Sequence, residues 1–465
     1  MQFVVMIFLV AFIFCGCAEM ADSLNYRANL PQNSLFYVID SSDEVDLSAN
    51  LIEYNVDSSE SNPQSAESTE STELKKQYLK RYFSVWESEF KPPQKNDVFW
   101  AIYDKSGFDE SKKPINAQFF AEIVESMNMD SYPSMQKRAI MVKTANVRAL
   151  PTNKPRFSKI DGYPFDRWQN SLIFAYTPII VLHSTKSKEW LLIQSSFVAG
   201  WVKADEVAFM SDSQVREMKN ADFVLPLSDK IPLYHNGAFL QNARVGMLFP
   251  VVRGDSQGDL HKDLAKKRES SKIIAYKRDL NGNAVKIRID FDKNLFAPFP
   301  LPLSQTNIAK MIEIIGAENY GWGGMYENRD CSSFVRDIFA NVGVWLPRNS
   351  KAQVEWGKKA QGSLYVELPK DNDEKIATIL AQAKPFRTII WLKGHIMLYI
   401  GEIAGNPIVA HQVWGISNRN KTEIFSSVSI TTLTPKIDID SKNIVKNDED
   451  SKTLLDRIEA MNIVW

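Results

Sequence analysis

A cysteine at the junction of a glycine-rich loop and a helix is the first residue that could do chemistry. Cys331 lies in GWGGMYENRDCSSFVRDIF, and the apolar spacing after it predicts an amphipathic helix that begins near this residue. Asp330 is a good N-cap residue, so Cys331 would be one of the first residues of the helix. Unpaired N–H groups and the helix dipole would there favour the thiolate and lower the pKa of the thiol. The same N–H groups could hold a developing oxyanion. A cysteine that only packs in a core fits the loop and the helix equally well.

Two of the five histidines lie on consecutive predicted strands after this cysteine. His395 begins the run HIMLYIG, and His411 lies in PIVAHQVWG, so a hairpin can bring the two rings within hydrogen-bond reach. His395 would then be the base and His411 its orienter, an arrangement typical of nucleophilic catalysis. The alternatives are core histidines, or a zinc site that also uses Asp330. Zinc sites usually show CxxC or HxxxH pairs, which the sequence lacks, so we expect no metal and no cofactor.

The other two cysteines lie in an apolar N-terminal run, FVVMIFLVAFIFCGC, which is too short for a comfortable membrane span. Residues 1–17 resemble a bacterial lipoprotein signal with Cys17 as the lipidated residue, although no Lys or Arg precedes the run. An ordinary or uncleaved signal is the alternative. By the same resemblance, Ala18 after the cysteine would favour the outer membrane. We therefore expect an exported protein at the periplasmic face of a bacterial membrane, without a disulfide framework.

Changes in composition divide the rest of the chain. Its 465 residues suggest several domains, and its net charge of −1 gives no basic excess for a nucleic-acid partner. Residues 18–73 include a Ser/Glu-rich stretch that we interpret as a disordered tether, and 74–134 form a predicted helical segment. Short β-type runs predict small barrels at 135–212 and 213–300, and mixed helices and strands predict an α+β domain at 301–465.

The residues around Cys331 resemble the NlpC/p60 cysteine peptidase motif. The match includes YGWGGMYENRDCSSFVRDIFANVGVWLPRNSKAQ, then GHIMLYIG and a second histidine strand. Upstream, ANVRALPT, DGYPFDRWQNS, VLHSTKSKEWLLIQSSFVAGWV and PLYHNGAFLQNARVGMLFPVV look like paired bacterial SH3-like (SH3b) domains, and the helical segment looks like the family's N-terminal stabilising segment. The resemblance implies a papain-like α+β catalytic domain after two SH3-like β-barrels.

The same resemblance implies a function and site residues. It implies a cysteine endopeptidase that hydrolyses peptidoglycan stem peptides, commonly between γ-D-glutamate and a diamino acid, in cell-wall turnover or recycling. Cys331 would be the nucleophile, and Asp330 would receive the free amine of an N-terminal L-alanine, which would restrict the enzyme to peptides already freed from sugar. Asn349 stands where some relatives have Asp. The other residues that would line the substrate pocket are Ser332, Tyr320, Trp322, Arg348, Ser350, Tyr163 and Asp166.

Two other functions fit the same sequence. A non-catalytic peptidoglycan-binding lipoprotein could use the barrels to bind wall peptides. An amidase or acyltransferase could use the same cysteine and histidines on another acyl substrate. In each case we expect a monomer whose partners are stem peptides and a membrane that it reaches through a lipid anchor.

Overall fold

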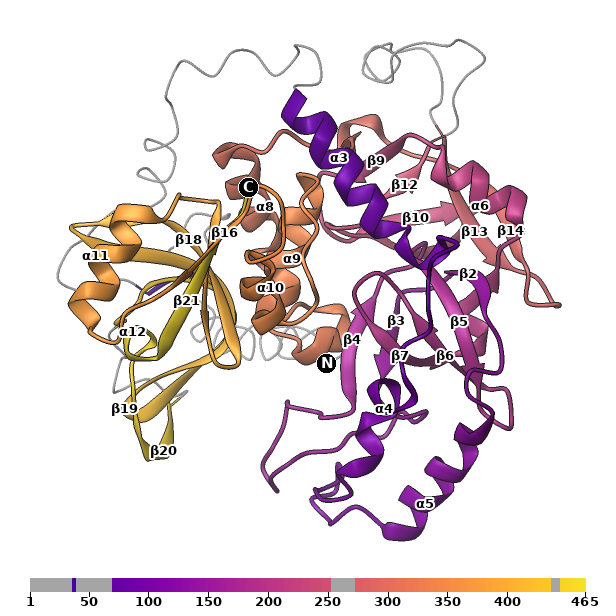
Figure 1. Cartoon of the computed structure of the whole chain (residues 1–465), viewed down its shortest axis with the longest axis horizontal. Helices are drawn as coiled ribbons and strands as arrows, with labels where there is room; N and C mark the ends of the chain where they lie inside the picture. Colours follow the sequence, from indigo (N-terminus) through magenta and orange to yellow (C-terminus); the bar gives the residue numbers. More distant parts are fainter. Residues whose placement is uncertain (1–35, 39–68, 252–271, 436–443) are drawn as a thin grey trace, which may run out of the picture.

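A computed structural model describes residues 36–38, 69–251, 272–435 and 444–465 (Figure 1). The predicted signal at 1–17, with its cysteine Cys17, lies outside the described residues. Within the described ranges, no helix combines the length and the apolarity that crossing a membrane would need.

The N-terminal helical segment begins earlier than the sequence predicted. Helix α3 (Thr69–Tyr82) starts inside the range assigned to the tether, where Glu70 in its first turn suits the positive end of the helix dipole. Strand β1 (Phe36–Val38) also lies in that range and pairs in parallel with strand β19. The range 18–73 is therefore not a tether throughout. The remaining elements of this segment are η1 (Ser84–Trp86), α4 (Lys95–Val98), η2 (Trp100–Tyr103), α5 (Ala117–Ser126) and η3 (Met129–Ser131).

The first barrel is one seven-stranded sheet with the strand order β4-β3-β7-β6-β5-β2-β8. Trp86 from the helical segment donates its indole N–H to the Ile179 carbonyl at 2.8 Å, so this segment is fastened to the barrel. The strands are β2 (Lys137–Met141), β3 (Ala145–Arg148), β4 (Gln169–Ile173), β5 (Pro178–Ser184), β6 (Trp190–Gln194), β7 (Ala199–Lys203) and β8 (Val207–Phe209).

The second barrel consists of three small sheets, and helix α6 (Asp212–Lys219) leads into it. Ser211 caps α6 with a hydrogen bond from the Gln214 N–H, a capping box that the sequence analysis did not identify. The sheets have the orders β12-β9-β15, β10-β11 and β13-β14. Their strands are β9 (Phe223–Pro226), β10 (Ile231–His235), β11 (Ala238–Ala243), β12 (Phe249–Pro250), β13 (Lys272–Arg278), β14 (Ala284–Asp290) and β15 (Phe296–Pro298), with η5 (Lys293–Leu295) before the last.

The C-terminal domain has helices on both faces of one sheet, in the order β1-β19-β18-β17-β21-β16 with β20 beside β19. Alternate residues of β18 enter two different cores, because successive side chains of a strand point to opposite faces. Ile396 and Leu398 pack with α8 and α9, whereas Met397 and Tyr399 pack with α11 and α12. The elements are α8 (Gln305–Ile315), η6 (Trp322–Glu327), α9 (Cys331–Asn341), α10 (Ser350–Trp356), β16 (Leu364–Glu367), α11 (Asn372–Gln382), β17 (Thr388–Leu392), β18 (His395–Ile403), β19 (Asn406–Thr432), β20 (Ile444–Ser451), α12 (Leu454–Arg457) and β21 (Ile458–Ile463).

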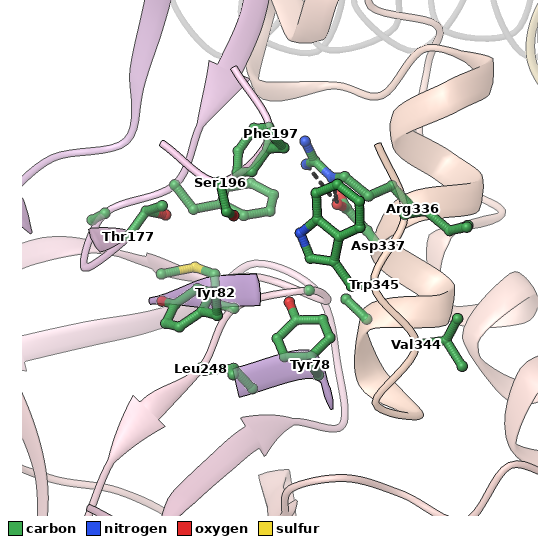
Figure 2. A pocket seen from close by; sticks show the side chains of 16 residues that line it. Tyr78, Tyr82, Thr177, Ser196, Phe197, Leu248, Arg336, Asp337, Val344 and Trp345 are labelled. Carbon is green, nitrogen blue, oxygen red and sulfur yellow. Dashed lines mark hydrogen bonds and ion pairs between the residues drawn. The ribbon is translucent and has the colours of Figure 1, made fainter. Parts of the chain in front are cut away.

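Helix α3, both barrels and α9 meet around a small cavity of about 30 Å³ (Figure 2). Tyr78 and Tyr82 reach it from α3, and Phe197 reaches it from the first barrel. On the α9 side, Arg336 forms an ion pair with Asp337 at 2.7 Å. Neither Cys331 nor the two strand histidines line this cavity, so it is a packing junction of four parts of the chain and lies outside the candidate site.

Candidate active site

Cys331 is the first residue of α9, as the sequence predicted, and it is 7% exposed. Asp330 caps the helix by accepting a hydrogen bond from the Ser333 N–H at 2.9 Å. The glycine-rich loop turns back on this cap, and the Gly323 N–H donates to the second Asp330 oxygen at 3.1 Å. Gly323 and Gly324 have φ angles of 59° and 86°, which glycine adopts without strain. Cap and loop together hold the cysteine at the start of α9.

The two histidines lie beside each other, as the hairpin required. His395 Nε2 is 2.8 Å from His411 Nδ1, and His411 Nε2 is 3.2 Å from the Thr431 hydroxyl. Because Nε2 of His395 is engaged by His411, its Nδ1 is the nitrogen left to serve a thiol. The N–H of Ile396, next to His395, hydrogen-bonds the Cys331 sulfur, which places the cysteine at the start of β18. Among the described residues, no group of three or more His, Cys, Asp or Glu side chains is arranged to hold a metal ion.

Burial favours the neutral forms of the thiol and of the imidazole, against the helix-start effect that would favour a thiolate. Burial raises the pKa of the Cys331 thiol to about 12, with a further contribution from the charge of Asp330. Burial also lowers the pKa of His395 to about 4, and Arg457 adds to this effect. Hydrogen bonding from the Ile396 N–H and the charge of Arg348 lower the cysteine pKa without offsetting the loss of water. Helix position alone therefore does not produce an ionised nucleophile here.

Comparison of the sequence with known families gives four matches along the chain. Residues 5–132 match the NLPC_P60 stabilising domain, 155–203 match an SH3 domain of SH3b1 type, 211–256 match an SH3 domain of SH3b2 type, and 317–423 match the NlpC/P60 family. The chain therefore contains an NlpC/P60 domain preceded by the stabilising domain and two SH3b-type domains. The NlpC/P60 match contains the cysteine and both strand histidines. Proteins of this family are generally cysteine peptidases.

One solved structure shares the fold over most of the chain. An NlpC/P60 endopeptidase from Photobacterium damselae subsp. piscicida superposes with a TM-score of 0.70 at 22% sequence identity, covering 85% of this chain and 93% of that chain. An NlpC/P60 family protein from Bacillus cereus has a TM-score of 0.39 at 15% identity, covering 63% of this chain and 81% of that chain. No curated protein matches the sequence.

In the NlpC/P60 domain, three predicted substrate residues form one buried cluster. Arg348 pairs with both oxygens of Asp330, at 3.1 and 2.7 Å, and donates to the Ser332 hydroxyl at 2.8 Å. Ser332 in turn donates to Asp330 at 3.2 Å. Burial opposes ionisation of Asp330, but Arg348 and the cap hydrogen bonds outweigh it and lower its pKa to about 2. The predicted receiver of a substrate amine thus already has a cationic partner inside the protein.

The first SH3b-type domain forms an aromatic rim beside the site. Tyr163 is 58% exposed, and its ring lies 6.3 Å from that of Trp414, which follows His411 on β19. Trp414 also lies 6.1 Å from Tyr320, whose hydroxyl has its pKa raised by burial and by the nearby Cys331. Asp166 does not face this rim, because its carboxylate pairs with Arg148 at 2.7 Å inside the barrel.

Two further predicted residues belong to different elements. Trp322 donates its indole N–H to the Asp166 carbonyl at 2.8 Å, so it joins the glycine-rich loop to the first SH3b-type domain. Ser350 is the first residue of α10 and is half-buried, with Asn349 as the cap of that helix.

The sequence analysis missed three residues of the site. Thr431 comes beside His411 because β19 folds back on itself, bringing Gly415 against Glu423. Phe165 and Trp414 complete the rim with rings 6.3 Å apart. The alternation of polar and apolar residues in VSITT indicates that Thr431 lies on a strand, but its partner His411 follows only from the fold.

Proposed function

We propose that this chain is a cysteine endopeptidase that hydrolyses amide bonds in peptidoglycan stem peptides. The observation that carries the proposal is the alignment of Cys331, His395, His411 and Thr431 in an NlpC/P60 domain. A protein that only binds the wall has no need for a thiol followed by two linked imidazoles.

The reaction begins from the neutral pair. As the peptide carbonyl approaches, His395 Nδ1 takes the proton of the Cys331 thiol, and the sulfur forms a bond to the carbonyl carbon. N–H groups at the start of α9 are placed to stabilise the oxyanion. The imidazolium then gives its proton to the leaving amine, and the C–N bond breaks. Water, deprotonated by His395, releases the acyl group and restores the thiol. His411 and Thr431 keep the imidazole oriented throughout.

We propose the γ-D-glutamyl–diamino acid bond of peptides with a free N-terminal L-alanine as the target. The amine would bind near Tyr320 and Asp330, where the buried carboxylate supplies a negative potential that Arg348 balances only in part. Tyr163 and Trp414 would narrow this end of the groove. A glycan strand attached to the alanine would meet this rim.

Hydrolysis of defined stem peptides by the wild type and by Cys331→Ala tests the proposal. We expect mass spectrometry to show one cleaved bond with the wild type and none with the variant, whose circular dichroism should be unchanged. An N-acetylated substrate should be cleaved much more slowly. Equal cleavage by Cys331→Ala would end the proposal, whereas cleavage at another amide bond would correct only the specificity.

We propose in addition that the protein is exported and anchored in the outer membrane through a lipid on Cys17, as a monomer. Strand β1 begins at Phe36, so 18 residues separate it from this cysteine. Labelling with a fatty-acid analogue should mark the wild type and leave Cys17→Ala unlabelled; labelling of both would overturn the anchor.

A further inference from the structure

We propose that the second SH3b-type domain is a positioning part of the catalytic centre, because its Asp229 and Arg244 hold the backbone that carries Cys331. This inference rests on the proposed function for one of its two readouts only.

Arg329 is the residue through which the domain acts. It is 2% exposed, and its guanidinium pairs with Asp229 at 3.0 Å, Glu318 at 2.7 Å and Asp337 at 2.8 Å. Its carbonyl accepts the Gly321 N–H at 2.8 Å, at the start of the glycine-rich loop. Arg329 directly precedes Asp330 and Cys331, so its side chain and its backbone together fix the strand that enters α9.

Arg244 extends the same set of ion pairs from the second SH3b-type domain. It is 1% exposed, with Asp229 at 2.9 Å and Glu318 at 2.6 Å. It also donates to the Glu327 carbonyl at 2.6 Å, which lies in the loop before the nucleophile. One arginine of the second domain therefore reaches both the acidic residues and the active-site loop.

Glu318 connects this cluster to the histidine side of the site. Its carboxylate forms ion pairs with both Arg244 and Arg329, and its carbonyl accepts a hydrogen bond from the Gln412 side chain at 3.2 Å. Gln412 also donates to the Asn319 carbonyl at 2.8 Å and is adjacent to His411. The ion pairs therefore help to position Cys331 through Arg329, and the two histidines through Gln412.

The backbone of the second domain follows α9 to its other end. Val245 donates its N–H to Asp229 at 2.9 Å, and Gly246 donates to the Asn341 side chain at 2.9 Å. Gly246 has a φ of 93°, and a Cβ there would lie 3.0 Å from Asp337. Residues 244–246 therefore contact the last residue of α9 through Gly246 and the loop before its first residue through Arg244.

The charges in this cluster balance, which explains why the arrangement can be buried. Arg244, Arg329 and Arg336 face Asp229, Glu318 and Asp337. Burial opposes ionisation of Asp229, but Arg329 and Arg244 outweigh it and lower its pKa to about 2. Loss of one carboxylate leaves two guanidinium groups beside each other, and displacement of a reacting group by about 1 Å can cost on the order of 100-fold in rate.

The test compares Asp229→Asn, the milder Arg244→Lys and the control Asp290→Asn in the full-length protein. Asp290 is in the same domain, but its ion pair with Lys272 at 3.2 Å lies at the surface. We expect Asp229→Asn to lower kcat on a stem peptide on the order of 10- to 100-fold with KM within about two-fold. Arg244→Lys keeps the charge and should show a smaller loss, and Asp290→Asn should match the wild type.

The rate of Cys331 alkylation by iodoacetamide at pH 8 provides the second readout, because it needs no peptide. Release of the helix should expose the buried thiol and raise this rate several-fold in Asp229→Asn, but not in Asp290→Asn. A folded Asp229→Asn or Arg244→Lys with unchanged kcat and alkylation, even with a lower melting temperature, would reduce the cluster to packing and overturn the inference. If the wild type cleaves no stem peptide, the proposed function fails, and alkylation alone still decides the inference.

Discussion

The two SH3b-type domains hold the same active-site loop by different physics. The first uses uncharged side chains: Gln169 donates to the Gly323 carbonyl at 3.0 Å, and the Ser171 hydroxyl accepts from the Arg348 guanidinium at 2.6 Å. The second uses buried ion pairs centred on Arg329 and Arg244. Substituting an uncharged hydrogen-bonding side chain lowers stability modestly, whereas removing one buried charge leaves its partners buried and unpaired. The first interface should therefore tolerate amino-acid substitution, while the second should resist it.

The largest expected effect comes from removing the centre of the ionic interface. Arg329→Ala leaves Asp229, Glu318 and Asp337 with one fewer buried cation, and we expect a loss of about 3–5 kcal/mol in the free energy of unfolding. Urea denaturation measures it. Lys143→Ala, which removes a surface pair with Asp205, should stay within about 0.5 kcal/mol of the wild type. Equal losses in the two variants would mean that the buried ion pairs stabilise the protein no more than a surface pair does.

The pH dependence of stability and activity should distinguish His395 from both interfaces. His395 has a pKa of about 4 against an ordinary 6.5, so its neutral form adds about 3 kcal/mol of stability above pH 6.5, which is lost as the pH falls through 4. The acid limb of kcat/KM should fall near pH 4 for the same reason. The Asp229 pKa of about 2 lies below this window, so Asp229→Asn should leave the limb in place. A limb near 6.5 would contradict the buried, neutral imidazole.

Steric contact is the strongest part of the first interface. A Cβ at Gly324 would lie 2.3 Å from the Cβ of Leu172, and its φ is 86°, so Gly324→Ala should cost about 2 kcal/mol or more. The matched control is Gly237→Ala, with a φ of 78° and nothing within 4 Å of the added Cβ, which should cost about 1 kcal/mol. Thermal unfolding compares the two; a larger loss at Gly237 would show that strain, and not the barrel, decides the outcome.

The smallest expected effect is the loss of one hydrogen bond to an uncharged hydroxyl. In Ser171→Ala the Arg348 guanidinium keeps Asp330, so the free energy of unfolding should fall by only about 1.5 kcal/mol, with a modest rise in KM. Steady-state kinetics and urea denaturation check this. A loss as large as that of Arg329→Ala would mean that both interfaces are equally intolerant.

Residues that act through local pattern were predictable from the sequence. Asp330 and Cys331 at a helix start, and His395 and His411 on neighbouring strands, follow from capping preference and apolar periodicity. The helix cap of α8 at Ser304 and its end at Gly316 follow in the same way.

Residues that act through distant contacts were not predictable. Asp229 and Arg329 are far apart along the chain, and each alone resembles a solvated surface charge. Thr431 reaches His411 only because β19 folds back. The high pKa of Cys331 also escaped prediction, since a sequence reveals the helix start but not how completely the surrounding domains remove water. The first turn of α3 has a distant partner of the same kind, because Glu70 lies 3.8 Å from Arg387.

The catalytic helix begins beside one accessory barrel and ends beside the other, with Ser171 near its start and Gly246 at its last residue. An excised peptidase module would bare Glu318, Arg329 and Asp337 to solvent and lose the template that shapes its glycine loop. An exchange of domains between related enzymes would therefore have to move the peptidase domain together with both barrels, because neither barrel could be replaced by itself.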